Sequence, residues 1–448
     1  MEATMSAVLP SIPIAPGRLP VLGHLPAMSR DPLQFLQSLR RQGELVAFHL
    51  GARPVYLVNA PELIRQVLVT DAAKFQRGKV FRKARQLLGN GLATADNPEH
   101  LEQRRIVQPA FHRARITGYA AIMRAEIERI TAAWPEGRRF RLDEQMAELT
   151  LNVTAKSLFH TDFSQAAVAE IHRSLAPVLN GVTSRALLPE FLEHLPTPAN
   201  RRFDEALLRL TSIVDKAIDD YRASGIDHGD LLSMLVTGEP VPDEEIRAQV
   251  LNLLMAGTET TATALSWLGY ELAAHPAIAD RVRAELTRVL GDRQAGPWDL
   301  PELSYVDRVI TETLRLHTPV WLLMRTSVEP VRLGGADLPA GTEVLVVPPT
   351  LHRDPALYPD PLRFDPDRWL HPDAKLWRRT RFFPFGGGAH HCVGDNFAWT
   401  EMALTVAAVY RHWDLALAPG ARVREVTRAF LKPSSVPVLA TRVVTPQS

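Results

Sequence analysis

The longest helical pattern in the chain runs from Asp243 to His275, and it constrains the fold more than any other feature. The pattern begins after Pro242 with an acidic first turn and ends before Pro276, which are typical start and stop signals of a helix. A helix of this length spans about 50 Å, so it must cross a whole domain. The sequence therefore predicts a body built around one central helix.

The rest of the chain carries shorter patterns, with neither a low-complexity linker nor a repeat. We therefore expect a single large domain over residues 1–448, mainly α with a small β lobe, and disorder over residues 1–15. The 35 prolines indicate many loops and sharp helix ends. Strands are expected near 45–60, 320–350 and 423–443, helices over 61–71, 98–135, 142–160, 201–225 and 302–317, and a long loop over 77–99.

Composition restricts the class of protein. The net charge is only +1 and 46% of the residues are hydrophobic, so nothing indicates a nucleic-acid partner. The first residues are interrupted by Pro10, Pro13, Pro16 and Pro20, and they have the pattern of neither a membrane span nor a signal peptide. A single unpaired cysteine fits a reducing compartment, so we expect a cytoplasmic protein.

Cys392 is the only cysteine of the chain. One thiol cannot by itself form a disulfide, a zinc–thiolate site or an iron–sulfur cluster. It can serve as a nucleophile, as the axial thiolate of a haem iron, or as a small buried residue. Gly386, Gly388 and Gly394 favour the haem, because they allow tight turns and a close approach to a flat ligand. The helix expected over 396–410 would place the thiol near a helix N-terminus, whose dipole favours a thiolate.

A second unusual pattern lies in the middle of the long helix, in the run Ala256-Gly-Thr-Glu-Thr260. Glycine in a helix interior costs about 1 kcal/mol relative to alanine, and threonine side chains bond back to backbone carbonyls. We therefore expect a distorted, widened turn, which is often found at functional sites. A threonine-rich polar face packed against a neighbouring element is the alternative.

The pattern F-x-x-G-x-x-x-C-x-G over 385–394 resembles the haem-binding loop of the cytochrome P450 family. The pattern Ala-Gly-x-Glu-Thr-Thr in the long helix resembles the oxygen-binding groove of the same family. The resemblance implies the cytochrome P450 fold, a heme b cofactor (iron protoporphyrin IX) and a soluble, bacterial type of enzyme. By this resemblance, Cys392 is the iron ligand, and Phe385 and Gly394 belong to the loop that supports it. Ala256 and Gly257 leave room over the iron, and Glu259 and Thr260 deliver protons.

Glu312 and Arg315 lie three residues apart and share a helix face, which by itself indicates only a surface ion pair. Their E-x-x-R spacing resembles a hallmark of the family. The run 364–369 resembles the segment whose arginine, here Arg368, completes a Glu–Arg–Arg network. The resemblance thus gives these three residues a structural role, in which they brace the cysteine loop.

Haem propionates need cations or hydrogen-bond donors. His100 and Arg104 are four residues apart in a run that resembles the propionate-binding helix of the family. Arg325 matches a further propionate arginine, whose planar guanidinium suits a carboxylate, and His390 stands where many relatives have arginine. Taken alone, each of these residues is more readily explained as a solvated surface group.

The resemblance implies a monooxygenase that inserts one atom of O2 into a lipophilic small molecule, and the chain looks most like bacterial members that oxidise cyclic terpenes such as sesquiterpenes. Because no flavin or ferredoxin domain is fused to it, electrons must come from a separate ferredoxin and ferredoxin reductase. The alternatives are an isomerase or dehydratase on the same scaffold and a haem-binding protein without turnover. A cysteine hydrolase would need a general base near Cys392 and a second group that orients the base, and beyond His390 and His391 the sequence places no such pair. By analogy, the apolar substrate pocket draws on Phe81, Leu88, Leu254, Thr258, Trp321, Leu322 and Phe430.

Overall fold

The computed structural model describes residues 12–161, 163–187, 190–237 and 241–443. The contacts divide the chain into two compact units. The helical unit comprises residues 80–320, 363–371 and 392–448, and the sheet unit comprises residues 1–79, 321–362 and 372–391. Each unit is thus assembled from segments far apart in the sequence, and a single domain over the whole chain stays a prediction.

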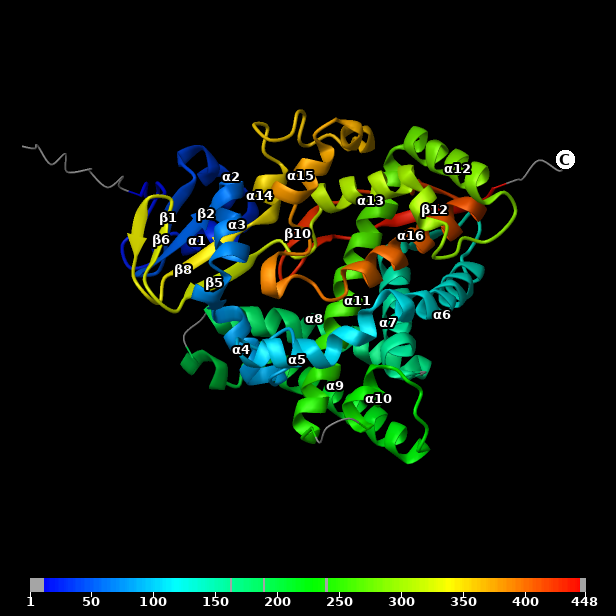
Figure 1. Cartoon of the computed structure of the whole chain (residues 1–448), viewed down its shortest axis with the longest axis horizontal. Helices are drawn as coiled ribbons and strands as arrows, with labels where there is room; N and C mark the ends of the chain where they lie inside the picture. The colour runs from blue at the N-terminus through cyan, green and yellow to red at the C-terminus, as the bar shows by residue number, and fades with distance from the viewer. Residues whose placement is uncertain (1–11, 162, 188–189, 238–240, 444–448) are drawn as a thin grey trace, which may run out of the picture. The chain divides into compact units, whose positions relative to one another are not determined.

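The helical unit is built around α11, which runs without interruption from Asp243 to Ala274 and packs against α7 (Figure 1). The prediction of a long central helix is therefore confirmed. The prediction of a widened turn at its centre is wrong, because the helix stays regular there. The hydroxyls of Thr260 and Thr263 donate to the carbonyls of Ala256 and Glu259, at 2.6 and 2.7 Å. These bonds satisfy the threonines inside the α-helical geometry.

Shorter helices and small sheets complete the helical unit. β4, β12 and β9 form an antiparallel sheet in that order, and β10 and β11 form a hairpin. The elements are α4 (Lys79–Leu88), α5 (Glu99–Val107), α6 (Arg113–Ala132), α7 (Leu142–Phe159), α8 (Gln165–Leu187), α9 (Pro198–Ser224), α10 (Leu231–Thr237), α12 (Pro276–Leu290), α13 (Ser304–Leu316), α16 (Asp395–His412), β4 (Arg139–Arg141), β9 (Trp413–Leu417), β10 (Glu425–Thr427), β11 (Leu431–Pro433) and β12 (Pro437–Arg442).

Several helices differ from the sequence prediction. The segment predicted as a long loop over 77–99 contains α4, which carries many charged residues between Gly78 and Gly89. The helix predicted over 98–135 is broken into α5 and α6 by a short 3-10 turn that includes Pro109, since proline cannot continue an α-helix ladder. The sequence prediction also omitted α8, which contains Pro177 in its interior.

The sheet unit contains a five-stranded sheet with the order β1-β2-β8-β5-β3 (Figure 1). Only the β2–β8 pair is parallel within this sheet. Val58, Val344 and Val346 of the sheet share a buried apolar cluster with Ile64 and Phe75. The elements are α1 (Leu25–Arg30), α2 (Pro32–Leu39), β1 (Leu45–Leu50), β2 (Arg53–Val58), α3 (Pro61–Arg65), β3 (Phe75–Arg77), β5 (Leu323–Ser327), β6 (Val331–Leu333), β7 (Ala336–Leu338), β8 (Glu343–Val346), α14 (Pro348–His352) and α15 (Ala374–Thr380).

The start of the chain is more ordered than predicted. Residues 1–11 of the stretch predicted to be disordered lie outside the described residues. The rest of that stretch is ordered, since Ile14 forms a parallel bridge with Ala47 and Ala15 is buried. Among the described residues, none of the helices has the length and apolar character that crossing a membrane requires.

Candidate active site

Cys392 lies in the helical unit, three residues before α16 begins at Asp395. The start of α16 is held by an aromatic cluster, in which Phe397 packs edge-on against Phe111 and Tyr119. A Cβ on Gly394 would lie 3.4 Å from the Phe111 ring, so the chain passes within van der Waals reach of that ring. This packing fixes how the chain enters α16 and thereby places the thiol.

The thiol of Cys392 is accessible, yet protein atoms surround it closely enough to disfavour a charge. Desolvation raises the pKa of this thiol to about 11, and the opposing effects of the Gly394 amide and the Arg104 guanidinium are smaller. The position ahead of α16 therefore does not by itself produce a thiolate, contrary to the expectation from the helix dipole. A cation at the sulfur, such as a haem iron, would be needed to displace the proton.

Residues 385–391 of the cysteine loop belong to the sheet unit. Gly388 there has a φ of +65°, and a Cβ on it would lie 1.9 Å from the carbonyl oxygen of Leu68. Leu68 lies in η2 (Gln66–Thr70), a single π-helical turn. Only glycine allows this approach of two backbones, so the structure gives Gly388 a packing role.

We expect Gly388→Ala to destabilise the protein, because the new methyl group meets a backbone carbonyl that cannot rotate away. Gly420→Ala is the matched control, since Gly420 has a φ of +74° and nothing within 4 Å of an added Cβ. In both variants an alanine must adopt a left-handed backbone conformation, so this strain cancels in the comparison. The remaining difference in the free energy of unfolding, about 1–3 kcal/mol, measures the clash. Thermal unfolding of the two variants measures this difference, and equal midpoints would contradict the packing role.

The centre of α11 presents an accessible strip. Ala256 is exposed although Met255 beside it is buried, and Thr260 one turn further along is half-buried. Residues four apart share a helix face, so Ala256 and Thr260 form one continuous accessible patch. A strip of this kind in the middle of a buried helix is what a bound group would cover.

Gly257 faces a different direction from Ala256. A Cβ on Gly257 would lie 2.9 Å from the Oγ1 atom of Thr154 on α7. Thr150, one turn earlier on α7, donates a hydrogen bond of 3.0 Å to the carbonyl of Thr258. The small residue thus lets α7 approach α11. Its predicted role in making room over the iron stays a prediction.

Glu259 also points away from the accessible strip. It lines a polar cavity of about 910 Å³ together with Ala262, Thr263 and Ser266, which lie one and two turns further along α11. Lys432 of β11 donates a hydrogen bond to the Glu259 carboxylate. Thr260, the predicted partner of Glu259, instead donates to the backbone of Ala256. The structure thus holds the Glu259 carboxylate and the Thr260 hydroxyl, the two groups predicted to deliver protons, on adjoining faces of α11.

The residues predicted to bind haem propionates are divided between the units. His100 is buried on α5, and Arg104 on the same helix is half-buried and electrostatically favours ionisation of Cys392. Arg325 is buried on β5 of the sheet unit and donates to the carbonyl of Met324 at 2.9 Å. His390 follows Gly388 in the loop of the same unit, in the short 3-10 turn η8 (Gly388–His390). Their role as propionate ligands stays a prediction.

The residues predicted to line the substrate pocket are likewise divided. Leu254 and Thr258 are one turn apart on α11, and both are almost completely buried. Because Ala256 and Thr260 provide the accessible face of this helix, Leu254 and Thr258 lie off it. Phe81 and Leu88 are on α4 and Phe430 is at the tip of the β10–β11 hairpin, whereas Trp321 and Leu322 belong to the sheet unit.

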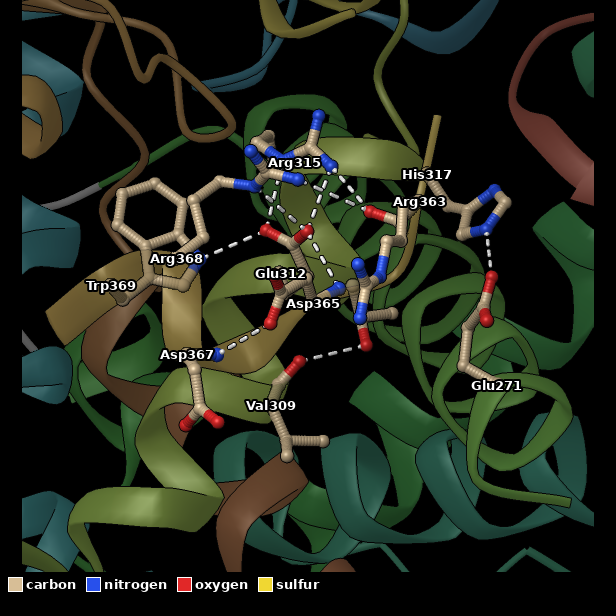
Figure 2. A network of polar contacts seen from close by, with 11 residues as sticks. Glu271, Val309, Glu312, Arg315, His317, Arg363, Asp365, Asp367, Arg368 and Trp369 are labelled. Atoms are coloured by element: carbon tan, nitrogen blue, oxygen red, sulfur yellow. Dashed lines mark hydrogen bonds and ion pairs between the residues drawn. The ribbon is translucent and has the colours of Figure 1, made fainter. Parts of the chain in front are cut away.

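Glu312 and Arg315 of α13 form the centre of a buried network in the helical unit (Figure 2). Both side chains are 0% exposed, so the pair is a core feature and not a surface ion pair. Glu312 accepts two hydrogen bonds of 2.8 Å from Arg315 and one of 3.2 Å from Arg368. The Trp369 indole and the Asp365 amide donate to the same carboxylate at 3.0 and 3.1 Å. The predicted Glu–Arg–Arg contacts are therefore present.

Two contacts of the site were not predicted from the sequence. Trp369 lies at the end of the run 364–369 but was given no role, although a buried indole N–H usually has an acceptor. Lys432 is separated from Glu259 by 173 residues, so no local pattern pairs them. Across the parts of the chain that the structure describes, no group of three or more His, Cys, Asp and Glu side chains forms a metal site. The role of Cys392 as the iron ligand stays a prediction.

The family model for cytochrome P450 matches residues 13–439 of the sequence. The chain belongs to the cytochrome P450 family. Members of this family carry a haem iron. The predicted mainly α fold with a small β part is thereby confirmed, and the match includes segments of both units.

Several cytochromes P450 from Streptomyces are similar to the chain over nearly their whole length. Cyclooctatin synthase of Streptomyces melanosporofaciens is 47% identical over 419 residues, which cover 92% of this chain and 91% of the relative. Cyclooctat-9-en-7-ol 5-monooxygenase of the same organism is 44% identical, with 91% and 90% covered. Pentalenene oxygenase of Streptomyces avermitilis is 38% identical, with 93% and 94% covered. The predicted class, an oxidoreductase that incorporates oxygen, is confirmed.

Proposed function

We propose that this protein is a haem-thiolate monooxygenase that inserts one atom of O2 into a cyclic terpene. The observation that carries the proposal is the accessible thiol of Cys392, placed by the aromatic cluster at the start of α16. The same unit presents the accessible strip of Ala256 and Thr260. A sulfur donor and an uncovered helix face, on a chain of this family, fit a bound heme b.

The chain's own residues would hold the haem and manage protons. Cys392 would ligate the iron, and His100, Arg104, Arg325 and His390 would hold the propionates. When bound, the haem iron supplies the activation of O2. Oxygen insertion consumes two electrons and two protons, and it releases the second oxygen atom as water. Glu259 and Thr260 would bring these protons to the accessible face of α11.

The substrate class rests on the relatives. Two of them are named for cyclooctat-9-en-7-ol and pentalenene, which are cyclic terpenes. The residues predicted for the pocket are mostly apolar, which suits a ligand with few polar groups. We place electron supply with a separate ferredoxin and its reductase, and the protein in the cytoplasm. The exposed Arg105 next to Arg104 is available to an acidic electron donor.

Product formation under labelled oxygen tests this function. The purified protein, a ferredoxin, a ferredoxin reductase and NADPH are incubated with pentalenene or cyclooctat-9-en-7-ol under 18O2. A product that carries one 18O atom, formed only with the complete electron supply, is expected. An isomerised or dehydrated product that carries no new oxygen and forms without the electron supply would instead establish the isomerase or dehydratase alternative. A product whose new oxygen comes from water would contradict the monooxygenase. Haem without any product from a panel of cyclic terpenes would contradict the substrate class.

We expect Thr260→Ala to separate electron consumption from product formation. The Thr260 hydroxyl lies on the accessible face of α11, where proton delivery needs a positioned donor. General acid catalysis typically raises a reaction rate by a factor of about 100 or more. Product formed per NADPH should therefore fall at least roughly tenfold, with the electrons recovered as hydrogen peroxide. Thr263→Ala is the matched control, since Thr263 makes the same backbone bond but lines the polar cavity. Equal product yields per NADPH in the two variants would contradict the role of Thr260 in proton delivery.

A further inference from the structure

Two aromatic rings stack where the end of α13 meets α11. His317 directly follows α13, and Trp267 lies in the second half of α11. Their rings are nearly parallel, at 6°, with centroids 3.9 Å apart, and both residues are buried. Stacked rings in a packed interior restrict each other, so Trp267 sets the orientation of the His317 ring.

The edges of the His317 ring contact two carboxylates. Its Nε2 atom lies 2.7 Å from Glu271 of α11, a contact that Figure 2 shows, and its Nδ1 atom lies 3.1 Å from Glu425 of β10. Both contacts are hydrogen bonds when both nitrogens carry a proton, since a carboxylate only accepts. Burial raises the pKa of Glu271, but hydrogen bonds from His275 and His317 outweigh it and hold this pKa below its usual value. His317 therefore joins α11 to the first strand of the β10–β11 hairpin.

Trp267 joins α11 to the second strand of the same hairpin. Its indole N–H donates a hydrogen bond of 2.8 Å to the carbonyl of Leu431 in β11. The Leu431 amide donates one of 2.9 Å to the carbonyl of Pro319, and the Leu431 side chain is fully buried. Both strands of the hairpin are thus attached to one group of side chains, the His317 cluster, which consists of His317, Trp267, Glu271 and Glu425.

The hairpin depends on these attachments. It has only two strands, in which Glu425–Thr427 pairs with Leu431–Pro433. A two-stranded hairpin by itself is marginally stable in water, so its geometry is decided by what it packs against. The His317 cluster supplies such a contact on each strand.

The tip of the hairpin carries Phe430, one of the residues predicted to line the substrate pocket. The Arg428 amide donates a hydrogen bond of 3.2 Å to the Phe430 carbonyl, which closes the tip. Phe430 is half-buried and directly precedes the anchored Leu431. Consecutive Cα atoms are about 3.8 Å apart, so a residue beside an anchored one has little freedom of position. The His317 cluster therefore sets where the Phe430 ring lies.

The chemistry of the His317 cluster indicates a geometric role. Apolar side chains could have packed the hairpin onto α11, but an imidazole, a carboxylate and an indole N–H are buried there. Burying such polar groups is costly unless each has a partner at the correct position. Buried ion pairs add little stability, and one attested use of them is to specify a single geometry.

We propose that His317 is a positioning residue that selects which carbon of the substrate is oxidised. Through Glu425 and Trp267 it holds both strands of the hairpin, and thereby the Phe430 ring against which an apolar substrate rests. The inference rests on the proposed function, since it assigns the regioselectivity of that oxygen insertion to a cluster outside the reacting atoms.

Variants of the holoenzyme test the inference with pentalenene and cyclooctat-9-en-7-ol as substrates. His317→Phe keeps a ring that can stack on Trp267 but removes both polar contacts. Glu425→Gln removes only the charge on the hairpin, at a side chain that is 30% exposed. His275→Phe is the matched control, because His275 contacts the same Glu271 carboxylate at 3.2 Å from within α11.

The ratio of the main oxygenated product to its positional isomers is the quantity to measure. We expect this ratio to fall at least about fivefold in His317→Phe and in Glu425→Gln, because selectivity is a small difference between competing transition states. The double variant should change it no further than His317→Phe does, since both substitutions break the same contact. His275→Phe should keep the ratio of the unmodified protein.

Hydrogen exchange of backbone amides provides a readout that is independent of activity. Amides of residues 425–432 should exchange faster in both cluster variants, whereas those of α13 keep their rates. Unchanged exchange in the hairpin, or a loosened hairpin with an unchanged product ratio, would overturn the inference. If the unmodified protein forms no oxygenated product, the proposed function has failed, and hydrogen exchange still decides whether His317 holds the hairpin.

Discussion

Replacing Cys392 by alanine is expected to abolish the absorption band of a thiolate-ligated haem. In the unmodified protein, reduction under carbon monoxide should produce the strongly red-shifted Soret band that a sulfur ligand gives. The alanine variant has no other thiolate to offer, because Cys392 is the only cysteine of the chain. The loss should therefore be complete, and oxygenated product should disappear with it.

A second variant, Cys392→His, tests the identity of the iron ligand while keeping a ligand at this position. An imidazole in place of the thiol can still bind the iron, so the haem should stay bound while the band moves to the position typical of histidine-ligated haem. A red-shifted band that persists in either variant would show that another group ligates the iron. Loss of all haem from the alanine variant alone would leave the histidine variant to decide the identity of the ligand.

Replacing Glu312 by alanine is expected to cause the largest loss of stability. Glu312 and Arg315 are both fully buried, and the carboxylate accepts hydrogen bonds from two arginines, an indole and a backbone amide. Without it, the buried Arg315 guanidinium loses the carboxylate that accepts two of its hydrogen bonds. Removing one partner of a buried ion pair typically costs about 3–5 kcal/mol.

Asp220→Ala is the control for Glu312→Ala. Asp220 pairs with Lys216 at 2.7 Å on α9, four residues apart, but both side chains are largely exposed. An exposed helical pair of this kind contributes about 0.5 kcal/mol or less. Urea titration followed by tryptophan fluorescence compares the two variants. Equal midpoints would mean that the Glu312 network is worth no more than a surface pair.

The elements that the sequence predicted well are those with local signals. The bounds of α11 followed from Pro242, the acidic first turn and Pro276, which act within one turn of the helix ends. The E-x-x-R spacing of Glu312 and Arg315 is also local, and the structure shows the contact. By contrast, the sequence prediction omitted α8, which contains Pro177 in its interior. This helix packs against α9, and such tertiary contacts leave no local signal in the sequence.

The orientation of side chains around α11 could not be predicted from the motif. A motif states which residues are present, but the neighbours of the helix decide which face each residue uses. Thr154 of α7 explains Gly257, and Lys432 of a distant hairpin turns Glu259 toward the polar cavity. Both partners are far away in the sequence and are brought to α11 only by tertiary packing.

The single thiol of the chain, which is accessible, also provides a chemical measure of cofactor content. A maleimide reagent can react with one atom per chain, because no other cysteine competes for it. An iron bound to that sulfur engages the lone pair that would attack the reagent. The labelled fraction of a preparation therefore counts the molecules that lack haem, and the unlabelled fraction counts those that are ready for catalysis.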